Sequence, residues 1–177
     1  MMQWYNEPPD WSERGNTITV TAAPKTDFWR KTHSGAITDN GHFYYQAVTG
    51  DFVAEVKVVG QYRALYDQAG LMARLDETTW LKCGIEYVEG VQYASAVVTR
   101  DQSDWSIVTL PQQPPALWLR VTRHGATFEV YYSFDGVQYT MLRQAYLTDT
   151  HSIRVGVMCA APTGDGFTAT FEGFTMR

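Results

Sequence analysis

The chain has 177 residues, of which 45% are apolar and 19% charged, a balance typical of a globular domain rather than a disordered segment. Acidic residues outnumber basic ones and the formal net charge is −5, so the basic surface that nucleic-acid binding needs is not expected. No apolar stretch approaches the ~18 residues of a membrane span, and the first residues lack the features of a signal peptide. We therefore expect one domain over residues 1–177 that neither enters a membrane nor binds nucleic acid.

The dominant pattern is an alternation of apolar and polar residues, interrupted by turn residues about every ten positions. A share of 14% aromatic residues also suits pleated sheets. Residues 61–68 are the one stretch considered for a helix, and they are too short and too rich in tyrosine. The pattern predicts an all-β fold, either a sandwich of two antiparallel sheets or a closed barrel. In chain order the expected strands are 17–22, 42–48, 51–59, 69–76, 79–88, 91–100, 104–109, 117–123, 127–134, 138–145, 152–160 and 167–175.

Two successive strands, 69–76 and 79–88, carry an unusual row of outward-facing side chains. The alternation turns apolar residues such as Leu71 and Leu81 toward the core. The opposite rows mix Trp, Met, Lys, Arg, Glu and Gln with glycines that leave room between the side chains. A mixed row of this kind is what the floor of a binding groove requires.

Six segments of the chain are similar, in order, to motifs of one family. They are Thr26–Thr32, Asp39–Phe43, Gly50–Phe52, Leu65–Met72, Trp80–Tyr87 and Ser103–Ser106. Together they resemble the domain-of-unknown-function family that includes the fungal regulation-of-enolase protein, with similarity from about Trp4 to Phe174. That family is grouped with concanavalin A-like lectins and glucanases. The resemblance implies a concanavalin A-like jelly-roll sandwich of two curved antiparallel sheets, with a ligand groove on the concave sheet.

On such a sandwich the outward rows and the adjoining loops would line the groove. Aromatic side chains there could stack on a sugar ring, and polar side chains could supply directed contacts. Simpler roles remain open: the tryptophans could fill the core or loop edges, Asp67 could cap a buried turn, and Glu86 could form an ion pair with Lys82 or Arg74. The candidate ligand-binding residues are Trp29, His42, Tyr66, Asp67, Gln68, Arg74, Trp80, Lys82, Glu86 and Trp105.

No cofactor or metal site is expected. The spacing of His33, Asp39 and His42 matches no standard metal-binding motif, and the remaining aspartates do not form the cluster that a calcium site requires. Cys83 and Cys159 stand alone, without a second cysteine or a histidine nearby in the sequence, and we expect both to be reduced core thiols of a cytoplasmic protein.

The leading hypothesis is a cytoplasmic binding protein whose groove takes a carbohydrate or a similar polar metabolite. A second hypothesis is a glycan-active enzyme that uses Glu86 with Asp67 or Asp104, although the Glu-x-Asp-x-x-Glu pattern of the related glucanases is absent. The third is a protein-interaction or regulatory module, suggested by the name of the fungal family member.

Overall fold

The computed structural model describes residues 1–177, which form sixteen strands and no helix. The prediction of an all-β fold is confirmed, and with it the absence of a helix over residues 61–68. No helix is available to cross a membrane. The strands are β1 (Gln3–Tyr5), β2 (Asp10–Arg14), β3 (Thr17–Ala22), β4 (Phe28–Arg30), β5 (Ile37–Asp39), β6 (His42–Thr49), β7 (Phe52–Gly60), β8 (Gln68–Arg74), β9 (Thr79–Val88), β10 (Val91–Arg100), β11 (Gln102–Thr109), β12 (Leu117–His124), β13 (Thr127–Ser133), β14 (Thr140–Tyr146), β15 (Ser152–Ala160) and β16 (Phe167–Met176).

Four of these strands, β1, β2, β4 and β5, were not among the twelve expected from the sequence. Three of them have only three residues, too few positions for an alternating pattern to be recognised. The fourth, β2, has an almost wholly exposed side-chain pattern because it lies at the edge of its sheet. Of the four, β1 pairs with the distant strand β6, whereas β2 pairs with the next strand β3, and β4 and β5 pair with each other.

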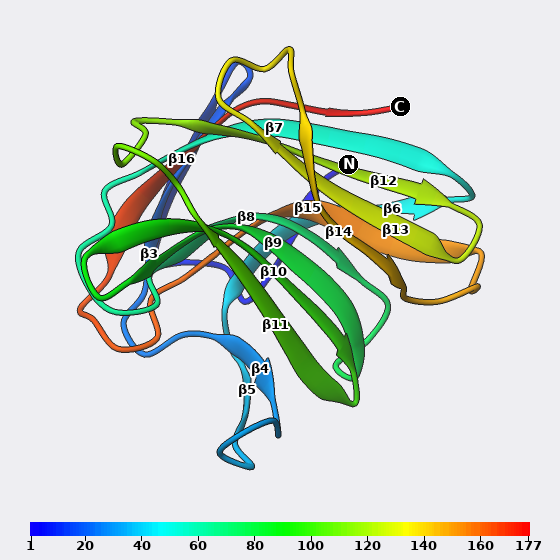
Figure 1. Cartoon of the computed structure of the whole chain (residues 1–177), viewed down its shortest axis with the longest axis horizontal. Coiled ribbons are helices and arrows are strands. Elements are labelled where there is room, and N and C mark those ends of the chain that lie inside the picture. The colour runs from blue at the N-terminus through cyan, green and yellow to red at the C-terminus, as the bar shows by residue number, and fades with distance from the viewer.

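Fourteen strands form two seven-stranded antiparallel sheets that face each other (Figure 1). The first sheet has the order β1-β6-β15-β8-β9-β10-β11, and the second has the order β14-β13-β12-β7-β16-β3-β2. Strands distant in the sequence are neighbours in space, as where β15 lies between β6 and β8. The expected two-sheet sandwich is therefore confirmed, and the closed barrel is wrong.

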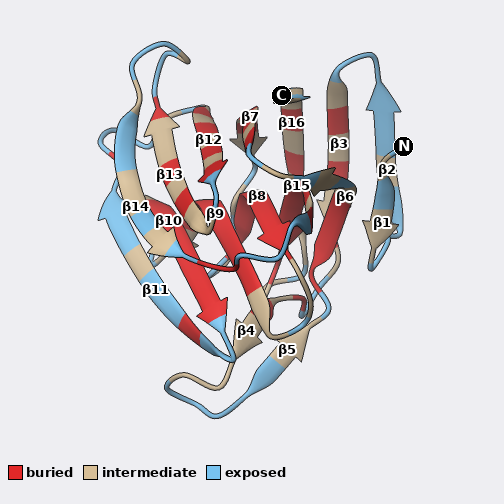
Figure 2. Ribbon diagram, turned by 90° about the vertical axis from the view of Figure 1, so that its right-hand side faces the viewer, coloured by how far each residue is buried: buried red, intermediate tan, exposed pale blue.

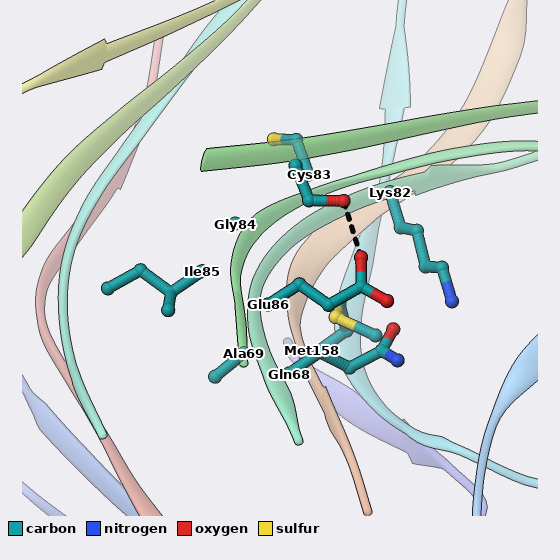
Figure 3. Close-up of a pocket in the computed structure, with 9 residues that line it drawn as sticks. Gln68, Ala69, Lys82, Cys83, Gly84, Ile85, Glu86 and Met158 are labelled. Atoms are coloured by element: carbon teal, nitrogen blue, oxygen red, sulfur yellow. Dashed lines mark hydrogen bonds between the residues drawn. The ribbon is translucent and has the colours of Figure 1, made fainter. Parts of the chain in front are cut away.

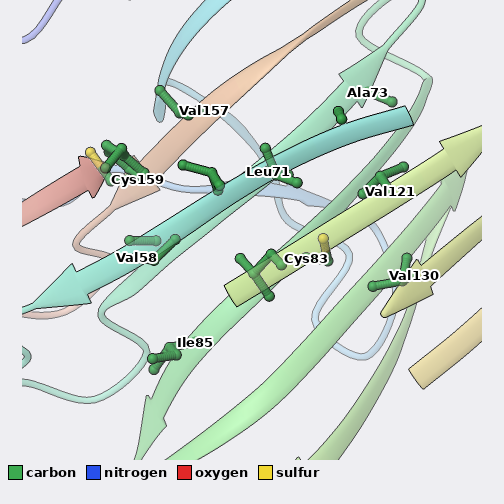
Figure 4. Packing of buried hydrophobic residues seen from close by; sticks show 14 of the residues in the cluster. Val58, Leu71, Ala73, Cys83, Ile85, Val121, Val130, Val157 and Cys159 are labelled. Atoms are coloured by element: carbon green, nitrogen blue, oxygen red, sulfur yellow. The ribbon is translucent and has the colours of Figure 1, made fainter. Parts of the chain in front are cut away.

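The core lies between the two sheets and contains 32 buried residues in one contiguous cluster. Figure 4 shows side chains of this cluster, among them Leu71, Val121 and Val130, meeting in the space between the strands. Burying one such side chain contributes roughly 1.5–3 kcal/mol. Figure 2 shows buried residues alternating with less buried ones along strands such as β3, β12 and β16, as expected when one face packs on the core.

The predicted facing directions of the cysteines are also confirmed. Cys83 and Cys159 belong to the core cluster, and neither forms a disulfide. Burial in apolar surroundings raises the pKa of the Cys83 thiol to about 12 and raises that of Cys159 as well, so neither is a reactive thiolate at neutral pH.

A two-stranded hairpin outside both sheets decides the shape of the outer surface. We call residues 26–41, which include β4 and β5, the cover hairpin. In Figure 1, strands β8–β11 curve over this hairpin, so the face of the sheet on the side of the hairpin is concave. Phe28 of the hairpin is fully buried in a second, smaller cluster against Met72 and Trp80. The hairpin therefore covers one part of the outer face of the first sheet and leaves the rest open.

Candidate functional site

The open part of this face forms a pocket of about 670 Å³. Small-molecule sites commonly have volumes of roughly 300–1,000 Å³, so the pocket has the size of a small-molecule site. The sheet supplies the floor, the cover hairpin one wall, and strand β11 with the loop before β8 the others. The lining residues are Asp27, Trp29, Thr32, His33, Ser34, Tyr66, Gln68, Lys82, Glu86, Val97, Ser103, Asp104 and Trp105.

The floor consists of the outward-facing residues that period-2 alternation brings together on neighbouring strands. Gln68 of β8 is the register partner of Glu86 of β9, and Lys82 of β9 is the partner of Val97 of β10. Figure 3 shows Gln68, Lys82 and Glu86 on one side of the sheet, with Ile85 pointing to the other. The predicted outward row is therefore present.

Glu86 is the central acidic group of the floor, and only 7% of it is exposed. Its Oε2 atom accepts hydrogen bonds from the hydroxyl of Ser95, at 2.6 Å, and from the indole nitrogen of Trp105, at 2.9 Å. The dashed line that ends on the Glu86 carboxylate in Figure 3 is the first of these bonds. Burial raises the pKa of Glu86, and the nearby Lys82 ammonium offsets part of that rise. Glu86 thereby fixes the Trp105 ring, which is 41% exposed, at the edge of the pocket.

Lys82 is bound to the cover hairpin rather than to Glu86. Its ammonium donates to the Phe28 carbonyl at 2.7 Å and forms an ion pair with Asp27 at 3.1 Å. The expected ion pair between Glu86 and either Lys82 or Arg74 is therefore wrong: Lys82 pairs with Asp27, and Arg74 pairs with Asp39. Sequence reasoning could not find these partners, because Asp27 and Asp39 reach the sheet only through the fold of the hairpin.

Tyr66 forms a further wall of the pocket in a strained conformation. Its φ is +69°, in the left-handed region that an aromatic residue rarely adopts. The following residue, Asp67, stabilises this turn, because its Oδ2 accepts the backbone N–H groups of Arg63 and Ala64, both at 2.9 Å. The Tyr66 ring meets the Trp105 ring edge-on at a centroid distance of 6.3 Å. Two aromatic walls thus adjoin the acidic floor.

Asp67 itself does not line the pocket. It is fully buried and has the turn-capping role that was the open alternative to ligand binding. The structure thus places Asp67, one of the candidate ligand-binding residues, outside the pocket.

Arg74 and Trp80 lie on the predicted face, but the cover hairpin buries them. Arg74 is 2% exposed, pairs with Asp39 at 2.7 and 2.8 Å, and stacks over the Tyr5 ring at 4.5 Å. Trp80 is fully buried beneath Phe28, with ring centroids 6.3 Å apart. Both residues hold the hairpin in place and do not line the pocket.

His42 is likewise a structural residue away from the pocket. It is 4% exposed; its Nδ1 lies 2.7 Å from the Asn6 carbonyl and its Nε2 accepts the Ala23 N–H at 3.0 Å. This pattern requires the proton on Nδ1, and burial lowers the pKa of the ring, which keeps it neutral. His42 therefore connects two chain segments to β6.

Six of the ten candidate residues line the pocket, namely Trp29, Tyr66, Gln68, Lys82, Glu86 and Trp105. Lining residues that the sequence analysis did not propose include Asp27, Val97 and Ser103. Val97 and Ser103 could have been found by extending the outward rows to β10 and β11, since Ser103 is the register partner of Thr99. Asp27 offered no such signal, because no strand was expected beside it.

The pocket does not contain the carboxyl pair that the hydrolase hypothesis named. Asp67 is engaged by its turn, and Asp104 is the register partner of the core-facing Val98, so its side chain leaves β11 on the side opposite Trp105. Asp27 is the carboxylate whose charge acts on Glu86, and it is already paired with Lys82. No group of three or more His, Cys, Asp or Glu side chains is arranged to hold a metal ion.

Two facing antiparallel sheets with a pocket on the outer face define a concanavalin A-like jelly-roll β-sandwich. A carbohydrate-binding module from Bacillus subtilis, CBM66, has this fold with a TM-score of 0.62 and 12% identity, over 98% of this chain and 94% of that one. At this identity the likeness concerns the fold alone.

The chain belongs to the family described as protein of unknown function (DUF1349), whose profile matches residues 4–177. It is 35% identical to Regulation of enolase protein 1 of Saccharomyces cerevisiae over 173 residues, which cover 98% of this chain and 87% of that protein. It also matches the crystal structure of a functionally unknown protein from Saccharomyces cerevisiae, with a TM-score of 0.96 and 35% identity, over 99% of this chain and 95% of that one. The family expected from the sequence motifs is thus confirmed.

Proposed function

We propose that this protein binds a carbohydrate, or a similarly hydroxylated metabolite, in the pocket on the outer face of the first sheet. The observation that carries the proposal is the convergence of Trp29, Tyr66 and Trp105 around a buried polar floor. Flat aromatic faces suit the apolar faces of sugar rings, while a few fixed polar groups orient the hydroxyls. The three aromatic residues come from three separate segments of the chain.

The backbone strain at Tyr66 supports this proposal. A φ of +69° at a non-glycine residue costs about 1 kcal/mol or more and persists only where the surrounding structure enforces it. Here the strain positions an aromatic ring at the pocket. Such outliers are concentrated at binding and catalytic sites.

The test is a binding titration with neutral mono- and oligosaccharides, followed by thermal unfolding. A ligand at about 100 times its Kd stabilises the folded state by about 2.7 kcal/mol, or roughly 5–11 °C for a chain of this length. Trp105→Ala should weaken that binding at least about tenfold. The matched control is Tyr146→Ala, which removes another aromatic ring, 53% exposed, outside the pocket. Equal binding by both variants would count against the pocket.

A protein-interaction surface is the second candidate. Ile107 and Val108 on β11 and Met141 on β14 are between 38% and 48% exposed, and these edge strands are connected by a hydrogen bond from Arg143 to Ser106. The name of the yeast relative, Regulation of enolase protein 1, fits a regulatory role of this kind. Sedimentation of the protein alone and of its Val108→Lys variant would show whether this edge pairs with a second copy.

We also propose a cytoplasmic location. The two cysteines are free and buried, as is usual for proteins of a reducing compartment. Detection of the protein in a secreted or periplasmic fraction would contradict it.

A further inference from the structure

Three side chains of the pocket keep a free hydrogen-bond acceptor. Glu86 uses only Oε2, Gln68 uses only its amide nitrogen, and Asp27 uses only Oδ1. The remaining oxygens of these three side chains have no partner in the protein and are not sealed from solvent. A ligand that satisfies them must bring donors, as the hydroxyl groups of a sugar do.

The indole and lysine donors of the pocket, by contrast, are already engaged. The indole nitrogen of Trp29 donates to the Thr32 carbonyl at 3.0 Å, and that of Trp105 donates to Glu86. The Lys82 ammonium has two partners within 3.1 Å and its side chain is only 6% exposed. No arginine lines the pocket. No free cationic fork therefore exists to receive a phosphate or a carboxylate.

The charges of the lining lead to the same conclusion. Asp27 and Glu86 contribute two carboxyl groups, against the single ammonium of Lys82, which is already paired with Asp27. A negatively charged ligand would meet a surplus of like charge at short range in a partly buried site. A neutral ligand would not.

We infer that the pocket selects uncharged sugars and excludes sugar acids and sugar phosphates, because its free carboxylate and amide oxygens accept hydrogen bonds and its one lysine ammonium is already paired. This inference rests on the proposed carbohydrate-binding function and adds the class of carbohydrate. Hydroxyl donors of the ligand reach Glu86, Gln68 and Asp27, while Trp29, Tyr66 and Trp105 contact its apolar faces.

The test compares matched ligands on the ¹⁵N-labelled protein. The probes are glucose with glucuronate and glucose 6-phosphate, galactose with galacturonate, and xylose. Binding is followed by the indole N–H signals of the tryptophans, assigned with Trp105→Phe and Trp29→Phe. We expect at least one neutral sugar to shift the Trp105 or Trp29 signal, with its anionic counterparts at least about tenfold weaker.

Charge-removing variants separate the local effect from the net charge of the protein. Asp27→Asn should narrow the difference in affinity between neutral and anionic ligands, because it removes a carboxylate of the pocket and frees the Lys82 ammonium. Asp149→Asn removes the same charge from an exposed position outside the pocket and should leave this difference in affinity unchanged.

The failures of the two proposals are distinguishable. Anionic sugars that bind as tightly as their neutral parents would overturn the charge selectivity while leaving sugar binding in place. If no sugar of either kind shifts the two indole signals, the proposed function fails and the selectivity fails with it.

Discussion

The ion pair between Arg74 and Asp39 should hold the cover hairpin on the first sheet, although neither residue lines the pocket. Arg74 is 2% exposed and binds both carboxylate oxygens of Asp39, at 2.7 and 2.8 Å. Its replacement in Arg74→Met leaves the carboxylate without its partner beneath the hairpin. Removing one member of a buried pair costs about 3–5 kcal/mol. The Asp39 side chain is 24% exposed and keeps its bond from the Tyr5 hydroxyl, so we expect the lower end, about 3 kcal/mol.

A second ion pair on the same hairpin provides the control. Lys31 pairs with Asp101 at 2.7 Å, but the two side chains are 40% and 55% exposed. Exposed pairs contribute about 0–1 kcal/mol, so Lys31→Met should change stability very little. At roughly 2–4 °C per kcal/mol for a chain of this size, Arg74→Met should lower the melting temperature by about 6–12 °C and Lys31→Met by no more than about 4 °C.

The assay combines urea unfolding with hydrogen exchange of the hairpin amides. In Arg74→Met the amides of residues 26–41 should exchange faster than those of the core strands, because local opening of the hairpin becomes easier. Sugar binding should weaken in the same variant, since Trp29 and Asp27 move with the hairpin. Equal losses of stability in the two variants, with unchanged exchange in the hairpin, would refute this explanation of how the pocket wall is held.

Two further predictions concern the floor of the pocket. Burial raises the pKa of Glu86 in the folded protein. At a pH between the ordinary glutamate pKa and this raised pKa, Glu86 is ionised in the unfolded chain but still protonated in the folded protein. The contribution of this group to stability is therefore full at low pH and is lost as the pH rises through that window, with a slope of up to about 1.4 kcal/mol per pH unit. In urea unfolding, Glu86→Gln should flatten the decline of the unfolding free energy as the pH rises above the ordinary pKa of glutamate, and an unchanged slope would contradict the direction of the Glu86 pKa shift. Gly84→Ala would place a Cβ 2.0 Å from the Ala69 carbonyl oxygen, and the forced backbone shift should cost about 1–3 kcal/mol or more. The control Gly125→Ala meets no atom within 4 Å and should lose only about 1 kcal/mol for its positive φ, so a similar loss in both variants would speak against the close approach of β8 and β9.

Local patterns were sufficient to determine twelve of the sixteen strands and the facing directions of β8 and β9. Period-2 alternation correctly assigned Leu71 and Cys83 to the core and Gln68, Lys82 and Glu86 to the opposite face. The alternation excludes a register shift of one residue, which would exchange the two faces of a strand, but the order of the strands and their partners required the fold. The facing directions depend on neighbouring residues only, which is why the sequence alone predicts them.

The division of the outward row into pocket and covered surface was decided by the tertiary structure. Glu86 and Trp80 lie on the same face of β9, yet one lines the pocket and the other is fully buried. The difference is made by Phe28 and the cover hairpin, which contact β9 from more than fifty positions away in the chain. No alternation within β9 contains that contact. The sequence therefore determined which side chains leave the sheet together, whereas long-range packing determined which of them a ligand can reach.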